Sequence, residues 1–281
     1  MLYEKEGNVA RVVLNRPDRH NAIFDTMFDE IVEGIRRGER DDDVKVIVLK
    51  GNGPSFSVGF DLSDADKFYG GADESGHEEN LRLGIEVLRH RAEVMRDVLF
   101  SGKPIIAQVH GSCVGAGTFL MLVCDFCIAA EGAAFGHPEE RYGSAGPIWC
   151  YPVVAAQIGL KKANEILMTG RKLPAEEAER LGLINKVVPP DQLEDEVAAL
   201  AAAIASQPRD GLALSTAFRH MSMGMLGYTN FFLPHYATHP LALYVRREPD
   251  EFNFRDVVRD RGLRGALQAR DEAFGGPYWG W

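Results

Sequence analysis

Short apolar runs alternate with amphipathic segments over the first two-thirds of the chain. Residues 1–15 predict a β-hairpin that turns at Gly7 and Asn8, because strand-like runs flank these two turn-forming residues. Apolar residues recur at helical spacing between residues 24 and 35, which predicts an amphipathic helix. The apolar run at residues 44–49 then predicts a further strand.

The same alternation continues until the chain becomes helical. An acidic triplet at residues 41–43 is expected to form a solvated turn, and the polar, glycine-rich residues 68–79 are expected to form a mobile loop. This order of strands and helices predicts an α/β core with a helical C-terminal part. The remaining predicted elements are a helix at residues 79–100, strands at 105–109 and 127–130, helices near 151–158, 161–169 and 175–181, a strand at 183–188 and helices from 191 onward.

The stretch from Lys103 to Asp125 is the first place to look for chemistry. A short buried strand there leads through Gly111, Gly115 and Gly117 into an apolar helix. The first N–H groups of such a helix have no partner within it, so they can bind an anion or a polarised carbonyl oxygen. The stretch lacks the Gly-Lys-Ser/Thr ending of a phosphate loop and the G-x-G-x-x-G order of a dinucleotide site. An oxyanion hole and a turn used only for close packing both stay open.

Composition narrows the class of protein. A chain of 281 residues with 46% hydrophobic residues is typical of a globular protein. A formal net charge of −10 argues against binding to nucleic acid or to an anionic membrane surface. The sequence contains no apolar run of about eighteen residues, and residues 1–20 lack the apolar core of a signal peptide. We therefore expect a cytoplasmic protein with no nucleic-acid or membrane partner.

Two of the four cysteines have the spacing of a redox or zinc motif. Cys124 and Cys127 lie in the run LVCDFCIAA, which predicts a buried strand. Side chains three positions apart on a strand face opposite sides of the sheet, so the two thiols cannot easily share a metal ion. Core packing is the expected role, with no metal and no redox cofactor.

Eight short motifs occur in a fixed order between about residues 5 and 205. They are LNRP at residues 14–17, NA at 21–22, FSVGFD at 56–61, KP at 103–104, GSCVGAG at 111–117, CD at 124–125, FGHPE at 135–139 and LGLIN at 181–185. Together they resemble the enoyl-CoA hydratase/isomerase family, the crotonase superfamily. The resemblance implies an α/β fold built as a spiral of β-β-α turns with a C-terminal helical trimerisation region. Residues 1–205 would form the acyl-CoA-binding core, and residues 206–281 would serve oligomerisation and cover the pocket.

The same resemblance implies the chemistry. The backbone N–H groups of Phe60 and Ala116 would form an oxyanion hole for the thioester oxygen of an acyl-CoA, and Glu139 would be the catalytic carboxylate. Hydratases of the family carry a further glutamate where this chain has Phe119, which cannot transfer a proton. One carboxylate favours double-bond isomerisation over hydration.

Other readings stay open at this point. Hydration remains possible, since an acid from the 62–80 region such as Asp64, Asp66 or Asp73 could replace the missing glutamate. An acyl-CoA decarboxylase, a thioester hydrolase and a non-catalytic homologue are the alternatives, and the acyl group is left undetermined.

The resemblance also implies a set of substrate-binding residues and an assembly. Coenzyme A would enter as part of the substrate rather than as a cofactor, and the chain would form a homotrimer or a dimer of trimers. The substrate-binding set consists of Arg16, His20, Ala22, Phe60, Asp61, Leu62, Gly115, Phe119 and Tyr142.

Overall fold

The computed structural model describes residues 1–62, 77–142, 149–232, 235–238, 248 and 250–275. The chain divides into two compact units that are interleaved along the sequence. The core unit consists of Met1–Phe60, Glu93–Phe135 and Leu173–Asn230, and the second unit consists of Asp61–Ala92, Gly136–Lys172 and Phe231–Trp281. The boundary predicted at residue 205 separates an acyl-CoA-binding part from a part for oligomerisation, and this division by function stays a prediction.

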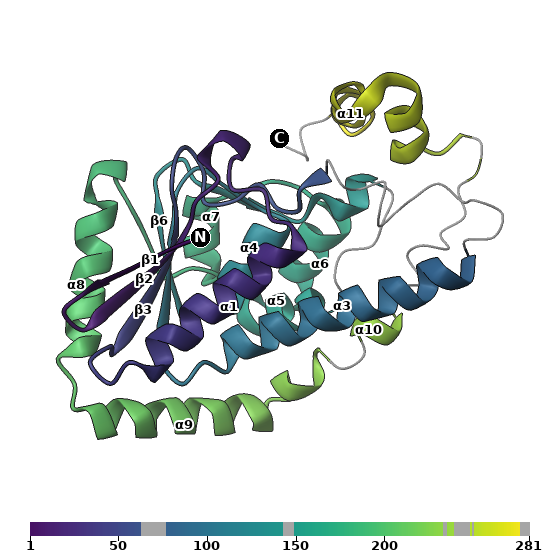
Figure 1. The fold of residues 1–281 in the computed structure, drawn as a ribbon. Helices are drawn as coiled ribbons and strands as arrows, with labels where there is room; N and C mark the ends of the chain where they lie inside the picture. The colour runs from purple at the N-terminus through teal and green to yellow at the C-terminus, as the bar shows by residue number, and fades with distance from the viewer. Residues whose placement is uncertain (63–76, 143–148, 233–234, 239–247, 249, 276–281) are drawn as a thin grey trace. The chain divides into compact units, whose positions relative to one another are not determined.

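A six-stranded sheet forms the centre of the core unit (Figure 1). The first two strands form the predicted antiparallel hairpin, and each later strand adds parallel to its neighbour. In sheet order the strands are β1 (Leu2–Glu6), β2 (Val9–Leu14), β3 (Val46–Gly51), β4 (Ile105–Val109), β6 (Phe126–Ala130) and β9 (Lys186–Val188). The last of these is shorter than the predicted strand at residues 183–188.

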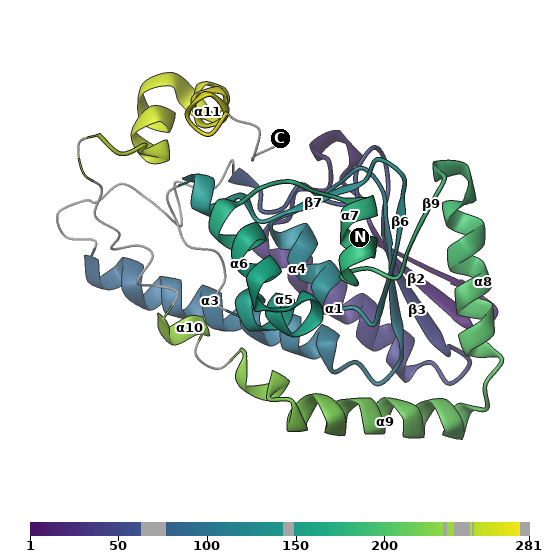
Figure 2. The ribbon, with the colours of Figure 1, turned by 180° about the vertical axis from the view of Figure 1, so that it is seen from behind.

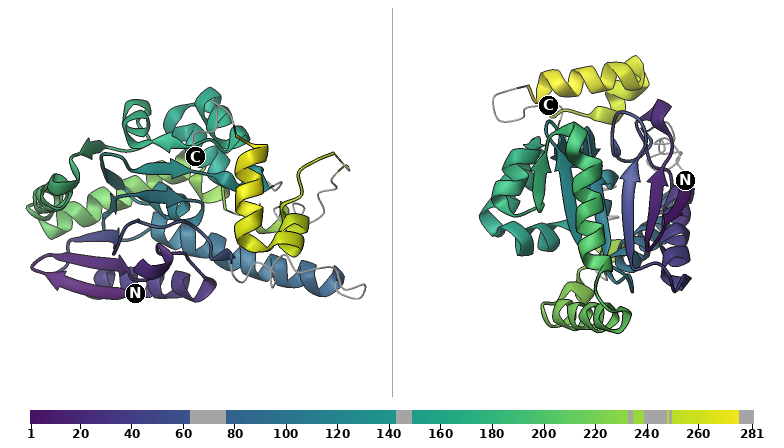
Figure 3. Two further views of the ribbon diagram at one scale, coloured as in Figure 1. Left: turned by 90° about the horizontal axis from the view of Figure 1, so that it is seen from above. Right: turned by 90° about the vertical axis from the view of Figure 1, so that its left-hand side faces the viewer.

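Helices cover both faces of this sheet. Helix α8 (Leu193–Ala205) lies along one face, where Val197 belongs to the same buried cluster as Val46 (Figure 3). Helix α1 (Asp25–Arg40) covers the opposite face, where Gly38 lies against Ile47. Successive residues of a strand point to opposite faces, so a strand covered on both sides is apolar throughout. This explains why the first four residues of β3, VIVL, are all apolar.

The remaining elements agree closely with the predicted helices. The three predicted at residues 151–158, 161–169 and 175–181 are confirmed, and the first two lie side by side in the second unit (Figure 2). The other helices and short strands are α3 (His77–Leu99), β5 (Ser112–Val114), α4 (Ala116–Leu122), β7 (Ala134–Gly136), α5 (Cys150–Ile158), α6 (Leu160–Thr169), β8 (Leu173–Pro174), α7 (Ala175–Leu181), α9 (Arg209–Met225), α10 (His235–Thr238) and α11 (Phe254–Ala273). A non-helical glycine, Gly262, interrupts α11.

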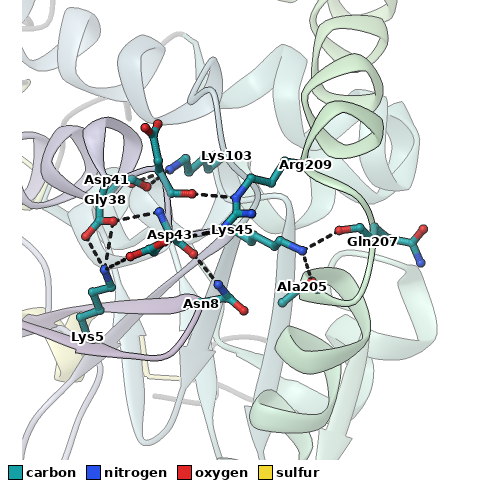
Figure 4. Close-up of polar contacts among 11 residues, drawn as sticks. Lys5, Asn8, Gly38, Asp41, Asp43, Lys45, Lys103, Ala205, Gln207 and Arg209 are labelled. Atoms are coloured by element: carbon teal, nitrogen blue, oxygen red, sulfur yellow. Dashed lines mark hydrogen bonds and ion pairs between the residues drawn. The ribbon is translucent and has the colours of Figure 1, made fainter.

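The acidic triplet after α1 is exposed at Asp42 and Asp43, as predicted, and it also contacts several cations (Figure 4). Lys5 Nζ lies 2.8 Å from Asp41 Oδ2, and Arg209 Nε donates to the carbonyl oxygen of Asp42 at 2.9 Å. Lys103 Nζ donates to the carbonyl oxygen of Asp41 at 2.5 Å. The last carbonyl groups of a helix lack partners within it, so this lysine caps the end of α1. The triplet thus joins the hairpin, α1 and α9.

The cysteine pair is arranged differently from the prediction. Cys124 lies in the turn before β6 rather than in the strand, and its thiol donates to the carbonyl oxygen of Leu120 at 3.2 Å. Cys127 is buried within β6, and burial raises the pKa of both thiols. Within the described ranges, no group of three or more His, Cys, Asp or Glu side chains is placed to hold a metal ion. No helix in the same ranges is long and apolar enough to span a bilayer.

Candidate active site

The two predicted N–H donors lie on neighbouring segments of the core unit. Ser57 forms a parallel bridge with Cys113 of β5, the short strand that leads into α4. The bridge is made by Ser57 N, which donates to Ser112 O at 3.0 Å, and by Val114 N, which donates to Ser57 O at 2.9 Å. The segment that ends at Phe60 therefore runs alongside the strand that ends at the start of α4.

Two glycines let these segments approach closely. Gly59 has a φ of +93°, and a Cβ added there would lie 2.7 Å from the carbonyl oxygen of Val114 and 3.4 Å from the amide nitrogen of Ala116. At Gly117, an added Cβ would lie 2.8 Å from the carbonyl oxygen of Ser57. Neither position accepts a side chain without a shift of backbone. Since Phe60 follows Gly59 directly, the peptide that carries the first donor lies next to the second.

The direction of the first donor follows from its peptide plane. The carbonyl oxygen of Gly59 accepts a hydrogen bond from Ile23 N at 2.7 Å. In a trans peptide the C=O and the following N–H point in opposite directions. The N–H of Phe60 is therefore directed away from Ile23, toward the side of the segment on which β5 and α4 lie.

The second donor opens a helix. Ala116 is the first residue of α4, and Gly115 is its N-cap. The Phe119 amide donates to the carbonyl oxygen of Gly115 at 2.9 Å, which is the first hydrogen bond of the helix. The amide of Ala116 comes before it, in the first turn, where a helix provides no acceptor of its own. Ala116 itself is fully buried, so the structure accommodates its methyl group between Gly115 and Gly117.

A buried hydrogen-bond network that sequence reasoning missed holds the first donor segment. Ser57 Oγ donates to the carbonyl oxygen of Asn21 at 2.7 Å and accepts from the amide of Gly59 at 3.1 Å. The Asn21 side chain donates to the carbonyl oxygen of Ser55 at 2.8 Å and accepts from the amide of Arg16 at 2.8 Å. Ser57 and Asn21 are both fully buried, so the network is shielded from water.

A sequence signal for this network does exist. Ser57 stands between Phe56 and Val58, and a polar residue inside an apolar run needs a buried partner. Asn21 has a φ of +55°, a conformation that asparagine tolerates better than most residues. Neither signal says which partner is used, because the partners lie 36 positions apart.

Phe119 lies in an aromatic cluster. Its side chain is 2% exposed, and its ring centroid lies 6.2 Å from that of Phe60. Phe60 in turn makes an edge contact with Phe28 at 5.9 Å. The position that carries an acid in hydratases of the family is thus part of an apolar core in this chain.

Three predicted substrate-binding residues share one loop of the core unit. Arg16 Nη1 donates to the carbonyl oxygen of Ala22 at 2.6 Å, and the guanidinium carbon lies 4.7 Å from the ring centroid of Phe24. His20 is exposed, and its Nδ1 lies 3.3 Å from Ser55 Oγ. The loop therefore presents a cation, an imidazole and a partly exposed aromatic ring.

Glu139 lies in the second unit, on the 3₁₀ turn η3 (Pro138–Tyr142). Its Oε2 atom is buried, and none of the described residues forms a hydrogen bond with it. Burial raises the pKa of Glu139 to about 8, and the charge of the neighbouring Glu140 adds to the increase. A carboxyl group with such a pKa can both accept and release a proton near neutral pH.

Tyr142 follows Glu139 by three positions on the same turn. Side chains at this spacing lie above one another on a 3₁₀ helix. The Tyr142 hydroxyl accepts a hydrogen bond from Arg270 Nη1 at 2.6 Å, and the ring makes an edge contact with Phe254 at 4.7 Å. Burial raises the pKa of Tyr142, and the charge of Glu139 acts in the same direction.

The predicted site residues thus divide between the two units. The core unit contains Arg16, His20, Ala22, Phe60, Gly115, Ala116 and Phe119, and the second unit contains Asp61, Leu62, Glu139 and Tyr142. The three aspartates at residues 64, 66 and 73 lie outside the described residues, and so does most of the loop predicted at 68–79.

A cleft of about 420 Å³ opens in the core unit away from these residues. Val32, Ile35 and Phe100 line its apolar part, and Arg36 pairs with Asp97 at 2.7 Å on its rim. The lining includes none of the predicted site residues, so the cleft takes no part in the chemistry considered above.

Comparisons with known proteins identify the family of this chain. The family model for enoyl-CoA hydratase/isomerase matches residues 4–225. The 1,2-epoxyphenylacetyl-CoA isomerase of Escherichia coli strain K12 is 34% identical over 217 residues, which are 76% of this chain and 79% of that protein.

Solved structures extend the likeness to nearly the whole chain. An enoyl-CoA hydratase/isomerase from Xanthobacter autotrophicus Py2 superposes with a TM-score of 0.84 at 29% identity, over 98% of both chains. An enoyl-CoA hydratase from Mycobacterium smegmatis gives a TM-score of 0.82 at 26% identity, over 96% of this chain and 92% of that one. These matches confirm the predicted α/β fold of the crotonase type. The chain therefore belongs to the enoyl-CoA hydratase/isomerase family and is an acyl-CoA enzyme.

Proposed function

We propose that this enzyme moves the double bond of an enoyl-CoA thioester, with Glu139 as the group that carries the proton. The observation that carries the proposal is the environment of Phe119, which is buried against Phe60 where hydratases of the family have an acid. One carboxylate with a pKa of about 8 suits removal and return of a proton. It suits water addition less well, because that reaction uses a second group.

The proposed reaction has two proton transfers and one enolate intermediate. Ionised Glu139 removes a proton from the γ-carbon of a 3-enoyl thioester, and the electron pair moves through the double bond onto the thioester oxygen. The N–H groups of Phe60 and Ala116 hold the negative oxygen, at about 2.7–4 kcal/mol for each donor. Protonated Glu139 then returns the proton to the α-carbon, which leaves the double bond between the α- and β-carbons.

Coenzyme A would bind as part of the substrate. The loop that carries Arg16, His20 and Ala22 supports this, because it offers a guanidinium and an imidazole to phosphate groups beside an exposed aromatic face. We assign the segment from Phe60 through Asp61 to Leu62 to the same ligand. No separate cofactor is proposed.

We also propose that the enzyme is a homotrimer or a dimer of trimers, and that α9 contributes to the contact between subunits. Four apolar side chains follow one another along this helix at spacings of four, three and four residues, which places them on one face. Each of these side chains is more than half exposed, and a contiguous apolar surface of this kind is typical of a protein contact rather than of a helix in water. They are Leu214, Phe218, Met221 and Met225.

The function is tested by mass spectrometry of 2-enoyl-CoA and 3-enoyl-CoA incubated with the enzyme in D₂O. We expect double-bond migration with deuterium uptake and no added water. Glu139→Gln should lower the rate by a factor of about 10²–10⁴, the usual effect of losing an acid/base group. Glu140→Gln is the matched control, because it removes the neighbouring carboxylate and should change the rate by less than about tenfold.

Other products would point to other reactions. Addition of water at a comparable rate would show that an acid elsewhere in the chain replaces the missing glutamate. Release of CO₂ or free CoA would indicate a decarboxylase or a thioester hydrolase. Failure to bind any acyl-CoA in calorimetry would indicate a non-catalytic homologue.

A further inference from the structure

Helix α11 contacts the turn that carries Glu139 at two successive residues. Arg141 is buried, and its Nη2 lies 3.0 Å from Oδ1 of Asp271 on α11. Phe274, just beyond the helix, lies with its ring centroid 6.0 Å from the guanidinium carbon of the same arginine. The residue two positions after Glu139 is thus held by an ion pair and an aromatic contact.

The next residue of the turn is held as firmly. Arg270 Nη1 donates to the Tyr142 hydroxyl at 2.6 Å, and its guanidinium carbon lies 5.1 Å from the centroid of the tyrosine ring. Asp271 Oδ1 accepts from Arg270 Nη2 at 2.7 Å, in addition to its bond with Arg141. One carboxylate oxygen therefore accepts from both arginines that link the turn and α11.

These contacts matter because the position of the Glu139 carboxylate depends on its own turn. Its Oε2 atom is buried without a hydrogen-bond partner among the described residues, and the carboxylate accepts a hydrogen bond from the backbone of its own residue, so its position follows that of η3. A single 3₁₀ turn has weak internal hydrogen bonds and offers little stiffness by itself. Helix α6 also packs against this turn, and α11 adds the ion pair and the side-chain hydrogen bond described above. Helix α11 lies beyond residues 4–225, the part of the chain that the family model matches.

We propose that α11 is a clamp on the Glu139 turn, with Arg270 and Asp271 as positioning residues that act through Tyr142 and Arg141. The clamp keeps the carboxylate in place for proton transfer without contacting the substrate. The inference rests on the proposed role of Glu139 as the proton carrier.

The main test compares Arg270→Met with Arg259→Met in the full-length enzyme. Methionine keeps the apolar stem of the arginine but removes the bond to Tyr142. Arg259 is the matched control, because it lies on the same helix, is exposed, and pairs with Asp256 at 3.1 Å rather than with the turn. The first readout is the rate of deuterium uptake at the α-carbon of a bound acyl-CoA, measured beside the Kd of that acyl-CoA.

We expect Arg270→Met to slow deuterium uptake by a factor of about 10–100, because small misplacements of a catalytic group have effects of this size. The Kd should change by less than about threefold, and Arg259→Met should leave both quantities near the wild-type values. Arg270→Lys should recover part of the rate, since an ammonium group can donate one hydrogen bond to the hydroxyl. The double variant Arg270→Met with Tyr142→Phe should be no slower than the slower single variant.

A second readout needs no turnover. Backbone hydrogen exchange in a peptide that covers residues 136–142 should become about tenfold faster in Arg270→Met and in Asp271→Ala than in Arg259→Met, because the turn opens more often. Equal hydrogen exchange in all three variants would refute the clamp. A double variant whose rate loss equals the product of the two single-variant losses would refute it as well. Absence of deuterium uptake in the wild-type enzyme would instead refute the proposed function, and the peptide exchange would still decide on the clamp.

Discussion

Replacement of Ser57 by alanine should disable the first N–H donor while the protein stays folded. The change removes the bond from Ser57 Oγ to the carbonyl oxygen of Asn21, 2.7 Å long, and the bond from the amide of Gly59, 3.1 Å long. Each buried backbone group left without a partner costs about 1–3 kcal/mol, so the free energy of unfolding should fall by about 2–6 kcal/mol. Domains are typically stable by about 5–15 kcal/mol, so a folded variant is expected.

The catalytic loss follows from the position of Gly59. Its amide is held by Ser57 Oγ, and its carbonyl oxygen is held by Ile23 N at 2.7 Å. With the first of these bonds lost, the peptide that ends in the Phe60 N–H can rotate away from the amide of Ala116. A fully lost donor would lower the rate by a factor of about 10²–10³, which sets the upper limit of the effect. Deuterium uptake into a bound acyl-CoA measures it, and urea unfolding measures the stability.

Ser55→Ala provides the control. Ser55 lies two residues earlier in the same segment and is buried, and among the described residues its hydroxyl contacts His20 alone, at 3.3 Å. This variant should keep its stability within about 1 kcal/mol of the wild-type value and its rate within about threefold. The reasoning is refuted if the two variants lose the same stability, or if Ser57→Ala exchanges deuterium at the wild-type rate.

Four further outcomes are expected. Deuterium uptake should rise with pH and level off above about 8, the pKa of Glu139, and Glu140→Gln should move this midpoint to lower pH. The pKa of Glu139 is raised above its ordinary value of 4.5, so the contribution of this group to the free energy of unfolding is present at low pH and is lost as the pH rises to about 8. Urea unfolding of Glu139→Gln should not show this loss. Lys45 Nζ donates to the carbonyl oxygen of Ala205 at 2.7 Å at the end of α8, so Lys45→Met should lower the free energy of unfolding by about 1.5–3 kcal/mol without slowing deuterium uptake. Met221→Glu should place a charge on the apolar face of α9 and shift the mass in light scattering toward a smaller species, whereas an unchanged mass would show that this face is not a subunit contact.

Most of the fold could be predicted because apolar periodicity is a local property. The hairpin at the start of the chain, α1 and the helices α5 to α7 each carry their own pattern, and the structure confirms them. Errors arose where neighbouring elements decide the outcome. Cys124 continues an apolar run, yet the strand begins only after it because the turn from α4 occupies that position.

The residues around the site show the same limit more clearly. The glycine turn and the Pro-Glu motif are local patterns, and the family resemblance that rests on them names Ala116 and Glu139 as candidates. The clamp could not, since Arg141 and Asp271 lie 130 positions apart and each resembles an ordinary surface charge in its own segment. Only the fold makes Asp271 the partner of a buried arginine.

Restoring an acid at Phe119 should not turn this enzyme into a hydratase. The side chain is 2% exposed and packs 6.2 Å from the ring of Phe60, so a glutamate there would enter an apolar cluster. Burial of this kind raises a carboxyl pKa by up to about 3–5 units, so the group would be largely protonated at neutral pH, and in a cluster shielded from water it would have no water molecule to activate. Loss of a buried phenylalanine also costs about 3–5 kcal/mol. Phe119→Glu should therefore unfold at lower urea concentration than Phe119→Leu and add no water to 2-enoyl-CoA. Water addition by a variant of wild-type stability would show that the aromatic cluster does not decide which reaction this enzyme performs.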